Sequence, residues 1–314
     1  LEPPHCPNAH PAARARPTTQ GAACSSPRAV GRTVRGEASL DGIPLGARDQ
    51  QTLDELRDPQ RRPYAPYQAM GSHILAFQPD EEMQLSPDAL VAGLRRACKG
   101  AAPGPSGLTA EALRLVLDDE EATDSLAQAA NLVAQAKVPV LAARALGLGR
   151  MMAVSKPNGK VRGLVVGDVF RRVVSRVLAQ QLAPHFQQAT HPHQFALSTR
   201  AGTESIVHFL QAALELDEQA TVLSVDGVGA YDTVSRNSML HGFMEVPVDN
   251  RCLPFVNLFY AAPSKYVWHD GRQRGVSRGT CSCQPFTPLP TAALRAVQAQ
   301  LQPNEALLAF LDDA

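Results

Sequence analysis

The feature that most constrains the fold of this 314-residue chain is a pair of short apolar runs that each end in aspartate. Thr221–Val225 leads into Asp226, and Ala306–Leu311 leads into Asp312 and Asp313. Short apolar runs bounded by polar residues are typical of buried β-strands. We expect the two strands to lie side by side, so that the three carboxylates meet at one edge of a sheet.

Three carboxylates at one edge would repel one another unless a cation lay between them. Carboxylate oxygens are hard ligands that suit Mg²⁺ or Mn²⁺. Two such ions, roughly 3.5–4 Å apart, stabilise the attacking and leaving oxygens of phosphoryl transfer. Asp226, Asp312 and Asp313 are therefore predicted to bind two Mg²⁺ ions, with Mn²⁺ as a substitute. The alternative is that each aspartate simply ends a strand or caps a turn, where Asp is common.

The remaining pattern mixes helices and strands without a regular βαβ repeat, which favours an α+β fold. Met151–Ser155 and Val161–Val166 flank Lys156-Pro157-Asn158-Gly159-Lys160, and Asn-Gly between two such runs is a strong hairpin signal. A long amphipathic helix is expected after Val169. Helices are also expected from the caps Ser86 and Thr109 and over 123–136, 201–216, 236–244, 250–261 and 291–301, with a short strand over 265–269.

Charge is unevenly distributed, although the net charge is zero. Residues 131–200 hold ten Lys or Arg and one acidic residue, whereas residues 201–232 hold six acidic residues and no Lys or Arg. A basic stretch can neutralise phosphates, and an acidic stretch can hold metal ions. The alternative is a pair of oppositely charged solvated faces.

Residues 1–65 are rich in Pro, Ala, Arg, Gly and Ser, and we predict that they are disordered. The six cysteines form no regular framework, and no secretory signal is recognisable, so we expect reduced thiols in an intracellular protein, nuclear or cytoplasmic. No apolar run approaches the roughly 20 residues of a membrane span.

Several motifs resemble those of reverse transcriptases. Asp226 followed by Tyr231 resembles the first catalytic motif of that family, in which an aromatic residue follows the aspartate after three or four residues. Phe310-Leu311-Asp312-Asp313 resembles its aromatic-x-Asp-Asp motif. The segment 104–109, Gly-Pro-Ser-Gly-Leu-Thr, is similar to the one that opens the domain in non-LTR (LINE-type) retrotransposon enzymes. The segment 156–179 is similar to the fingers hairpin and the helix that follows it.

The resemblance covers roughly residues 70–314 and implies the fingers and palm of a right-hand polymerase. Residues 66–220 would form a fingers-like region and residues 221–314 a partial palm, with the thumb absent because the chain is truncated after the Asp-Asp motif. By resemblance, Asp226 and Asp312 bind both metals with Asp313 in support, and Tyr231 stacks under the incoming sugar and excludes a 2′-hydroxyl. Arg162 would contact the triphosphate, assisted by Lys156 or Lys160. The implied partners are an RNA template, a DNA primer and deoxynucleoside triphosphates.

One family motif is missing. Gln-Gly-Asp-Pro-x-x-Pro is expected before the 291–301 helix, but residues 277–288 read Ser-Arg-Gly-Thr-Cys-Ser-Cys-Gln-Pro-Phe-Thr-Pro. Our hypothesis is that the coding sequence carries a local frameshift within residues 270–290. With a suitable choice of codons for these residues, reading the coding sequence from one base earlier yields Gln-Gly-Asp. Codons that cannot yield that tripeptide would exclude it. We therefore expect this chain to be inactive or nearly so. The alternatives are a catalytically dead nucleic-acid-binding remnant (a pseudogene product) and, less favoured because of Tyr231, an RNA-dependent RNA polymerase.

Overall fold

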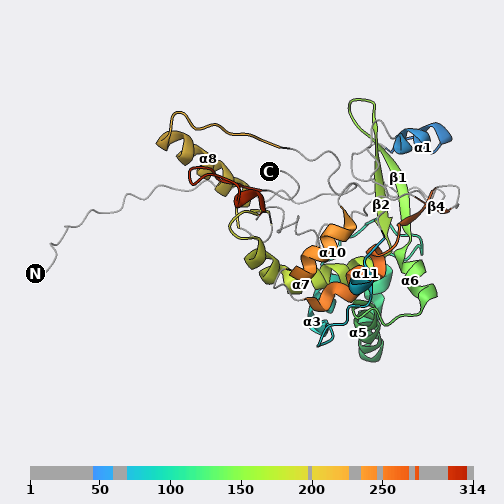
Figure 1. Cartoon of the computed structure of the whole chain (residues 1–314). Coiled ribbons are helices and arrows are strands. Elements are labelled where there is room, and N and C mark those ends of the chain that lie inside the picture. The colour runs from blue at the N-terminus through green and yellow to red at the C-terminus, as the bar shows by residue number, and fades with distance from the viewer. Residues whose placement is uncertain are drawn as a thin grey trace, which may run out of the picture. The chain divides into compact units, whose positions relative to one another are not determined.

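The computed structural model describes residues 45–58, 69–196, 200–225, 235–245, 250–268, 273–275 and 296–309. All of them fall in one compact unit, Glu37–Ala314. Helices and strands are mixed, as the α+β prediction requires (Figure 1). The described strands form one sheet in the order β2-β1-β3-β4. These strands are β1 (Gly149–Ser155), β2 (Val161–Gly167), β3 (Lys265–Val267) and β4 (Gln273–Gly275).

The predicted hairpin is confirmed. Strands β1 and β2 pair antiparallel along their whole length, from Gly149 opposite Gly167 to Ser155 opposite Val161. At the turn, the Lys156 N–H donates to the Lys160 carbonyl at 2.7 Å. Gly159 has φ +74°, a left-handed conformation that glycine adopts without steric cost. The Asn-Gly signal therefore marks the turn correctly.

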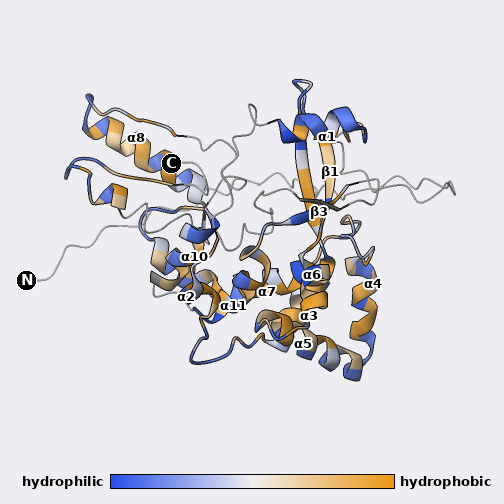
Figure 2. Cartoon of the chain, turned by 45° about the vertical axis from the view of Figure 1, so that its right-hand side comes forward, coloured by the Kyte–Doolittle hydropathy of each residue, from blue (hydrophilic) through white to orange (hydrophobic). Residues whose placement is uncertain are grey.

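A cluster of helices packs at one end of the hairpin (Figures 1 and 2). The long helix α7 (Val169–Thr190) buries the predicted apolar face, including Val174, Val177 and Leu178, which are each 0% exposed. The core around it also draws on α3, α5, α10 and α11. The bounds of these and the smaller helices are α2 (Ser72–Leu75), α3 (Pro87–Arg95), α4 (Ala110–Arg114), η1 (Leu115–Asp118), α5 (Glu120–Ala134), α6 (Val140–Gly147), α10 (Arg236–Glu245), η2 (Asn250–Cys252) and α11 (Leu253–Tyr260).

Both predicted N-caps are confirmed. The Ser86 hydroxyl accepts from the Ala89 N–H at 3.3 Å, and the Thr109 hydroxyl accepts from the Ala112 N–H at 3.2 Å. Each bond satisfies an N–H that has no partner within the helix. Helix α3 ends at Arg95.

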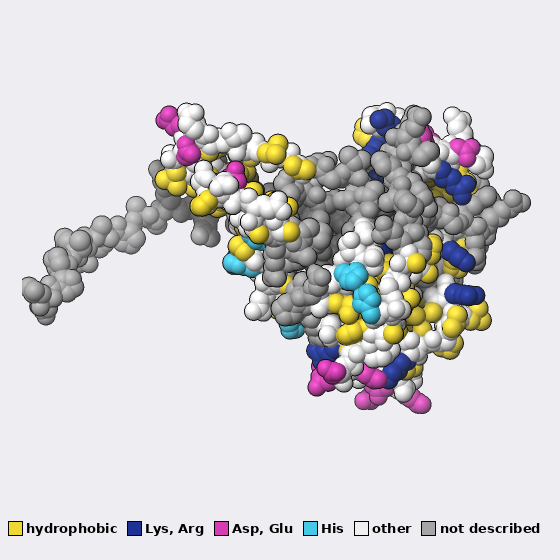
Figure 3. All heavy atoms as spheres, in the orientation of Figure 1, with side chains coloured by type: hydrophobic (Ala, Val, Ile, Leu, Met, Phe, Trp, Pro, Cys, Tyr) yellow, Lys and Arg dark blue, Asp and Glu magenta, His cyan; other side chains and the backbone are white. Residues whose placement is uncertain are grey.

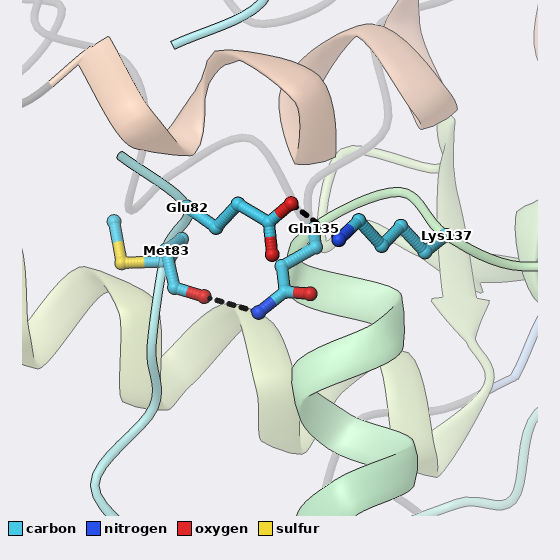
Figure 4. Close-up of polar contacts among 4 residues, drawn as sticks. All are labelled: Glu82, Met83, Gln135 and Lys137. Carbon is cyan, nitrogen blue, oxygen red and sulfur yellow. Dashed lines mark hydrogen bonds and ion pairs between the residues drawn. The ribbon is translucent and has the colours of Figure 1, made fainter. Parts of the chain in front are cut away.

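Side chains from the end of α5 and from the residues directly after it hold the extended segment that leads into α3 (Figure 4). The Gln135 amide donates to the Met83 carbonyl at 2.9 Å, and Lys137 forms an ion pair with Glu82. The Leu85 N–H donates to the Asn131 side chain at 2.7 Å. These bonds fix the position at which α3 begins.

The prediction that residues 1–65 are disordered is corrected for residues 45–58; residues 1–44 and 59–65 lie outside the described residues. Helix α1 (Gln50–Arg57) starts at Asp49, whose carboxylate accepts from the Thr52 N–H at 2.8 Å. Leu53 and Leu56 are each 1% exposed. They pack against a second, smaller cluster made by the sheet: Met151, Ala153, Tyr266 and Trp268. The helix forms because it buries these two leucines against the hairpin.

Two predicted strands are also corrected. Residues 221–225 follow helix α8 (Gly202–Leu216), form no strand and are exposed, with Leu223 81% exposed. Of the predicted strand 306–311, residues 306–309 are described. Ala309 forms a single parallel bridge with Gln194 and no pairing with 221–225. An apolar run becomes a buried strand only where a neighbouring strand pairs with it, and no described segment does so for 221–225.

Helix α8 leaves large apolar side chains exposed, among them Phe209 at 45% and Leu214 at 46%. The helix predicted over 291–301 is described from residue 296, where one helical turn spans 296–298. None of the helices in the described ranges has the length and apolar character to cross a membrane.

Candidate nucleotide-binding hairpin

The free end of the β1–β2 hairpin carries three exposed cations. Lys156 and Lys160 flank the turn, and Arg162 lies one residue into β2. Figure 3 shows Lys and Arg side chains at this end of the molecule. Among the described residues, none of the three forms an ion pair or a side-chain hydrogen bond. Their charges therefore remain available to an anion.

Alternation along β2 places Arg162 on a defined face of the sheet. Val161 and Val165 pack against the small cluster that contains α1. Successive side chains of a strand point to opposite faces, so Arg162 projects from the face away from α1. A guanidinium presents several donors in a fixed fork and binds phosphate at two points, whereas an ammonium acts as a point charge.

Helix α1 also contacts the hairpin near its turn. The Glu55 carboxylate accepts from the Val161 N–H at 3.2 Å, between Lys160 and Arg162 in sequence. Sequence reasoning missed this support. The signal was present in the cap residue Asp49 and in the Leu53–Leu56 spacing, which places both leucines on one helix face.

The base of the hairpin is packed tightly against the Gly-Pro-Ser-Gly-Leu-Thr segment. A Cβ at Gly104 would lie 2.6 Å from the Gly167 carbonyl oxygen, so only glycine fits there. Asp168, 5% exposed, caps α7 by accepting from the Phe170 N–H at 3.0 Å. The Arg172 guanidinium donates to the Ala102 carbonyl at 2.9 Å. This close approach fixes the hairpin relative to α7.

The basic stretch is not a uniform phosphate-binding surface. Arg171 is 2% exposed, and its guanidinium carbon lies 4.1 Å from the centre of the Phe259 ring, a cation–π contact. Burial lowers the pKa of Arg172, and the nearby Asp168 carboxylate acts in the opposite direction. Arg172 nevertheless stays charged at neutral pH, because the ordinary pKa of an arginine side chain lies far above 7. These two arginines serve packing, so they are not part of an exposed phosphate-binding surface.

A small cavity of about 70 Å³ lies at the edge of β1. A space of this size can hold water molecules. It is lined by Leu45, Gly46, Arg48, Arg150, Met151, Met152, Ala153 and Trp268.

The predicted metal ligands Asp226, Asp312 and Asp313, together with Tyr231, lie outside the described residues. So does the segment 277–288. Within the described ranges, no group of three or more His, Cys, Asp or Glu is placed to hold a metal ion. The carboxylate site therefore stays a prediction, and Lys156, Lys160 and Arg162 are the predicted site residues that the structure positions.

No protein-family model matches the chain. The chain is similar to a protein of a retrotransposable element. That relative is the retrotransposable element SLACS 132 kDa protein of Trypanosoma brucei gambiense, which is 23% identical over 228 residues. The match covers 70% of this chain and 19% of the SLACS protein, so the chain spans about a fifth of the relative's length.

Proposed function

We propose that the chain comprises the fingers and part of the palm of a reverse transcriptase, an RNA-directed DNA polymerase, from a non-LTR retrotransposon. The observation that carries the proposal is the hairpin: Lys156, Lys160 and Arg162 are exposed at one end of it and have no ion-pair partner among the residues that the structure describes. Its other end is packed against Gly104 of the Gly-Pro-Ser-Gly-Leu-Thr segment. The similarity to a retrotransposable element protein agrees with it.

In the proposed reaction the hairpin binds the triphosphate of the incoming deoxynucleotide. Arg162 would donate two parallel hydrogen bonds to phosphate oxygens, and Lys156 or Lys160 would neutralise further negative charge. The same cations would stabilise the charge that develops on the leaving pyrophosphate. Because Arg162 points away from α1, the nucleotide would lie on that face of the hairpin.

The carboxylates Asp226, Asp312 and Asp313 would hold two Mg²⁺ ions, since their oxygens are the hard ligands that Mg²⁺ prefers. The ions would stabilise the attacking 3′ oxygen and the leaving oxygen. Tyr231 would stack under the sugar and exclude a 2′-hydroxyl, and the partners would be an RNA template and a DNA primer.

The chain itself is proposed to have little or no polymerase activity, because residues 277–288 depart from the template-positioning motif. A second candidate function follows from the same departure: a nucleic-acid-binding remnant that keeps the basic hairpin without catalysis. The two candidates differ in whether the hairpin discriminates a nucleoside triphosphate from nucleic acid in general.

Equilibrium binding of Mg²⁺–dTTP and of single-stranded RNA to this chain separates them. For the enzyme-derived hairpin we expect Arg162→Ala to weaken dTTP binding at least tenfold, since a hydrogen bond to a charged group contributes about 1.5–3 kcal/mol. Binding of dTMP should change little. Arg95→Ala, which removes an exposed arginine from α3, is the matched control and should bind dTTP normally. Salt-sensitive RNA binding without any preference for dTTP would favour the remnant instead.

A further inference from the structure

Two histidines that are distant in sequence meet on the protein surface. His73 of α2 and His241 of α10 have ring centroids 5.1 Å apart, with an angle of 48° between the ring planes. The contact joins α2, near the beginning of the described helical cluster, to α10.

The His73 ring lies close to the backbone at Gly71. A Cβ at residue 71 would lie 2.6 Å from Cε1 and 2.9 Å from Nδ1 of His73, but 3.7 Å from Nε2. The imidazole therefore folds back over Gly71 with its Nδ1–Cε1 edge nearest the backbone. Glycine at this position is what allows the ring to adopt this orientation against His241.

The ring nitrogens have no competing role within the described part of the chain. Neither imidazole donates or accepts a hydrogen bond there, and neither is paired with a carboxylate. His73 is exposed and His241 partly exposed, so both rings can be reached from solvent. Neutral imidazole nitrogens in such a setting are good ligands for transition metals.

The distance between the rings fits a shared metal ion. A Zn–N bond is about 2.0–2.1 Å, and the ring centre lies about 1.1 Å behind the nitrogen, so each centre lies about 3.2 Å from the metal. Two such ligands at a tetrahedral angle place their ring centres about 5.2 Å apart. The observed 5.1 Å matches this value, and the 48° tilt excludes parallel stacking of the rings.

We propose that His73 and His241 form a binding site for a divalent transition-metal ion such as Zn²⁺, which links α2 to α10. Solvent or another donor completes the coordination, because no third His, Cys, Asp or Glu joins them among the described residues. Its two ligands are different residues from the predicted metal ligands Asp226, Asp312 and Asp313. Its ligands are nitrogen, so Mg²⁺ does not compete for it.

Isothermal titration of the full chain with Zn²⁺, after removal of bound metal by a chelator, tests the site. We expect His73→Ala and His241→Ala each to bind one equivalent less than the wild type, or to bind that equivalent at least tenfold more weakly. Excess Mg²⁺ should leave the wild-type titration unchanged. His208→Ala is the matched control, because His208 is an exposed histidine elsewhere, on α8.

Gly71→Ala tests the geometry without removing a ligand. Its Cβ displaces the His73 ring, so we expect the same equivalent to weaken while both histidines remain. Circular dichroism and the urea midpoint without metal should match the wild type in every variant, and Zn²⁺ should raise the midpoint only where both ligands are intact. Unchanged Zn²⁺ binding in His73→Ala or His241→Ala, or an equal loss in His208→Ala, would overturn the proposal.

Discussion

Replacing Leu56 by alanine tests whether helix α1 holds the β1–β2 hairpin in place. Leu56 is 1% exposed and packs in the small cluster with Leu53, Met151, Ala153, Tyr266 and Trp268. A helix of eight residues is not stable on its own in water, so α1 depends on this packing. We expect the loss to be local, because the cluster is separate from the larger core around α7.

The magnitude follows from burial. Truncation of a fully buried leucine costs about 2–5 kcal/mol, and the cost is smallest where the surroundings can close around the cavity. The cluster is small and lies next to solvent, so we expect about 2–3 kcal/mol, near the lower end of the range. At 1.4 kcal/mol per factor of ten, local opening of the hairpin should become roughly 30–150 times more frequent.

Amide hydrogen exchange measures this opening directly. Amides of β1 and β2 should lose protection by the stated factor in Leu56→Ala, while amides of α5 and α7 keep theirs. Leu115→Ala is the control, because Leu115 is 70% exposed and its truncation removes little buried surface. Equal loss of protection in the hairpin and in α7, or no loss in the hairpin, would refute the idea that α1 is a local support.

Two further predictions concern stability. Gly104→Ala should lower the free energy of unfolding, measured in urea, by about 1–3 kcal/mol, because its Cβ would lie 2.6 Å from the Gly167 carbonyl oxygen. Gly167→Ala is the control and should not lower it, because a Cβ at Gly167 would have no neighbour within 4 Å. Equal effects of the two substitutions would contradict the close approach at Gly104. The Gly100 N–H, at 2.6 Å from the Glu111 carboxylate, lowers the pKa of Glu111 below its ordinary 4.5. Because the folded-state pKa is lowered, the ionised Glu111 stabilises the fold at pH values above its unfolded pKa, and this stabilisation is lost as the pH falls through the folded pKa. Glu111→Gln should therefore be less stable than the wild type in urea at pH 7, and the difference should shrink below pH 4.5. A difference that does not depend on pH would contradict this.

Local signals in the sequence predicted local structure well. The caps Ser86 and Thr109 start helices as expected, because each supplies a hydrogen bond that depends only on residues three positions away. Asn158-Gly159 marks the hairpin turn for the same reason, since the left-handed φ at Gly159 is a local requirement. The face on which Arg162 lies was not predicted; it follows from the packing of Val161 and Val165 against the cluster that contains α1.

Features that depend on distant partners were not predictable in the same way. Helix α1 lies at the edge of a Pro- and Arg-rich region, and its two leucines gain stability only from the sheet, nearly 100 residues later. Residues 221–225 are as apolar as a buried strand, but apolar character does not supply a pairing strand. In the sequence, Arg171 was grouped with the basic residues that could bind phosphate. In the structure its guanidinium is buried against the ring of Phe259 on α11.

In the candidate site, too, the features that depend on neighbouring residues were predictable and those that depend on distant segments were not. The spacing of Lys156, Lys160 and Arg162 on one hairpin followed from the turn signal, and the structure places all three at its exposed end. The tight contact of Gly104 with the strand–helix junction could not be inferred from spacing, because it depends on two segments about 60 residues apart. The carboxylates and Tyr231 rest on the motif resemblance, and their convergence stays a prediction.

RNA-templated primer extension tests the central claim most directly. The chain would be fused at its C-terminus to the remaining palm and the thumb of a non-LTR reverse transcriptase, and residues 277–288 would be changed to the Gln-Gly-Asp-Pro form. The fusion would be supplied with an RNA template, a DNA primer, deoxynucleotides and Mg²⁺. We predict template-dependent DNA synthesis that falls below detection in Asp226→Ala and is retained in Arg95→Ala. No extension by the restored protein, or extension that survives Asp226→Ala, would contradict the assignment of this chain to a reverse transcriptase.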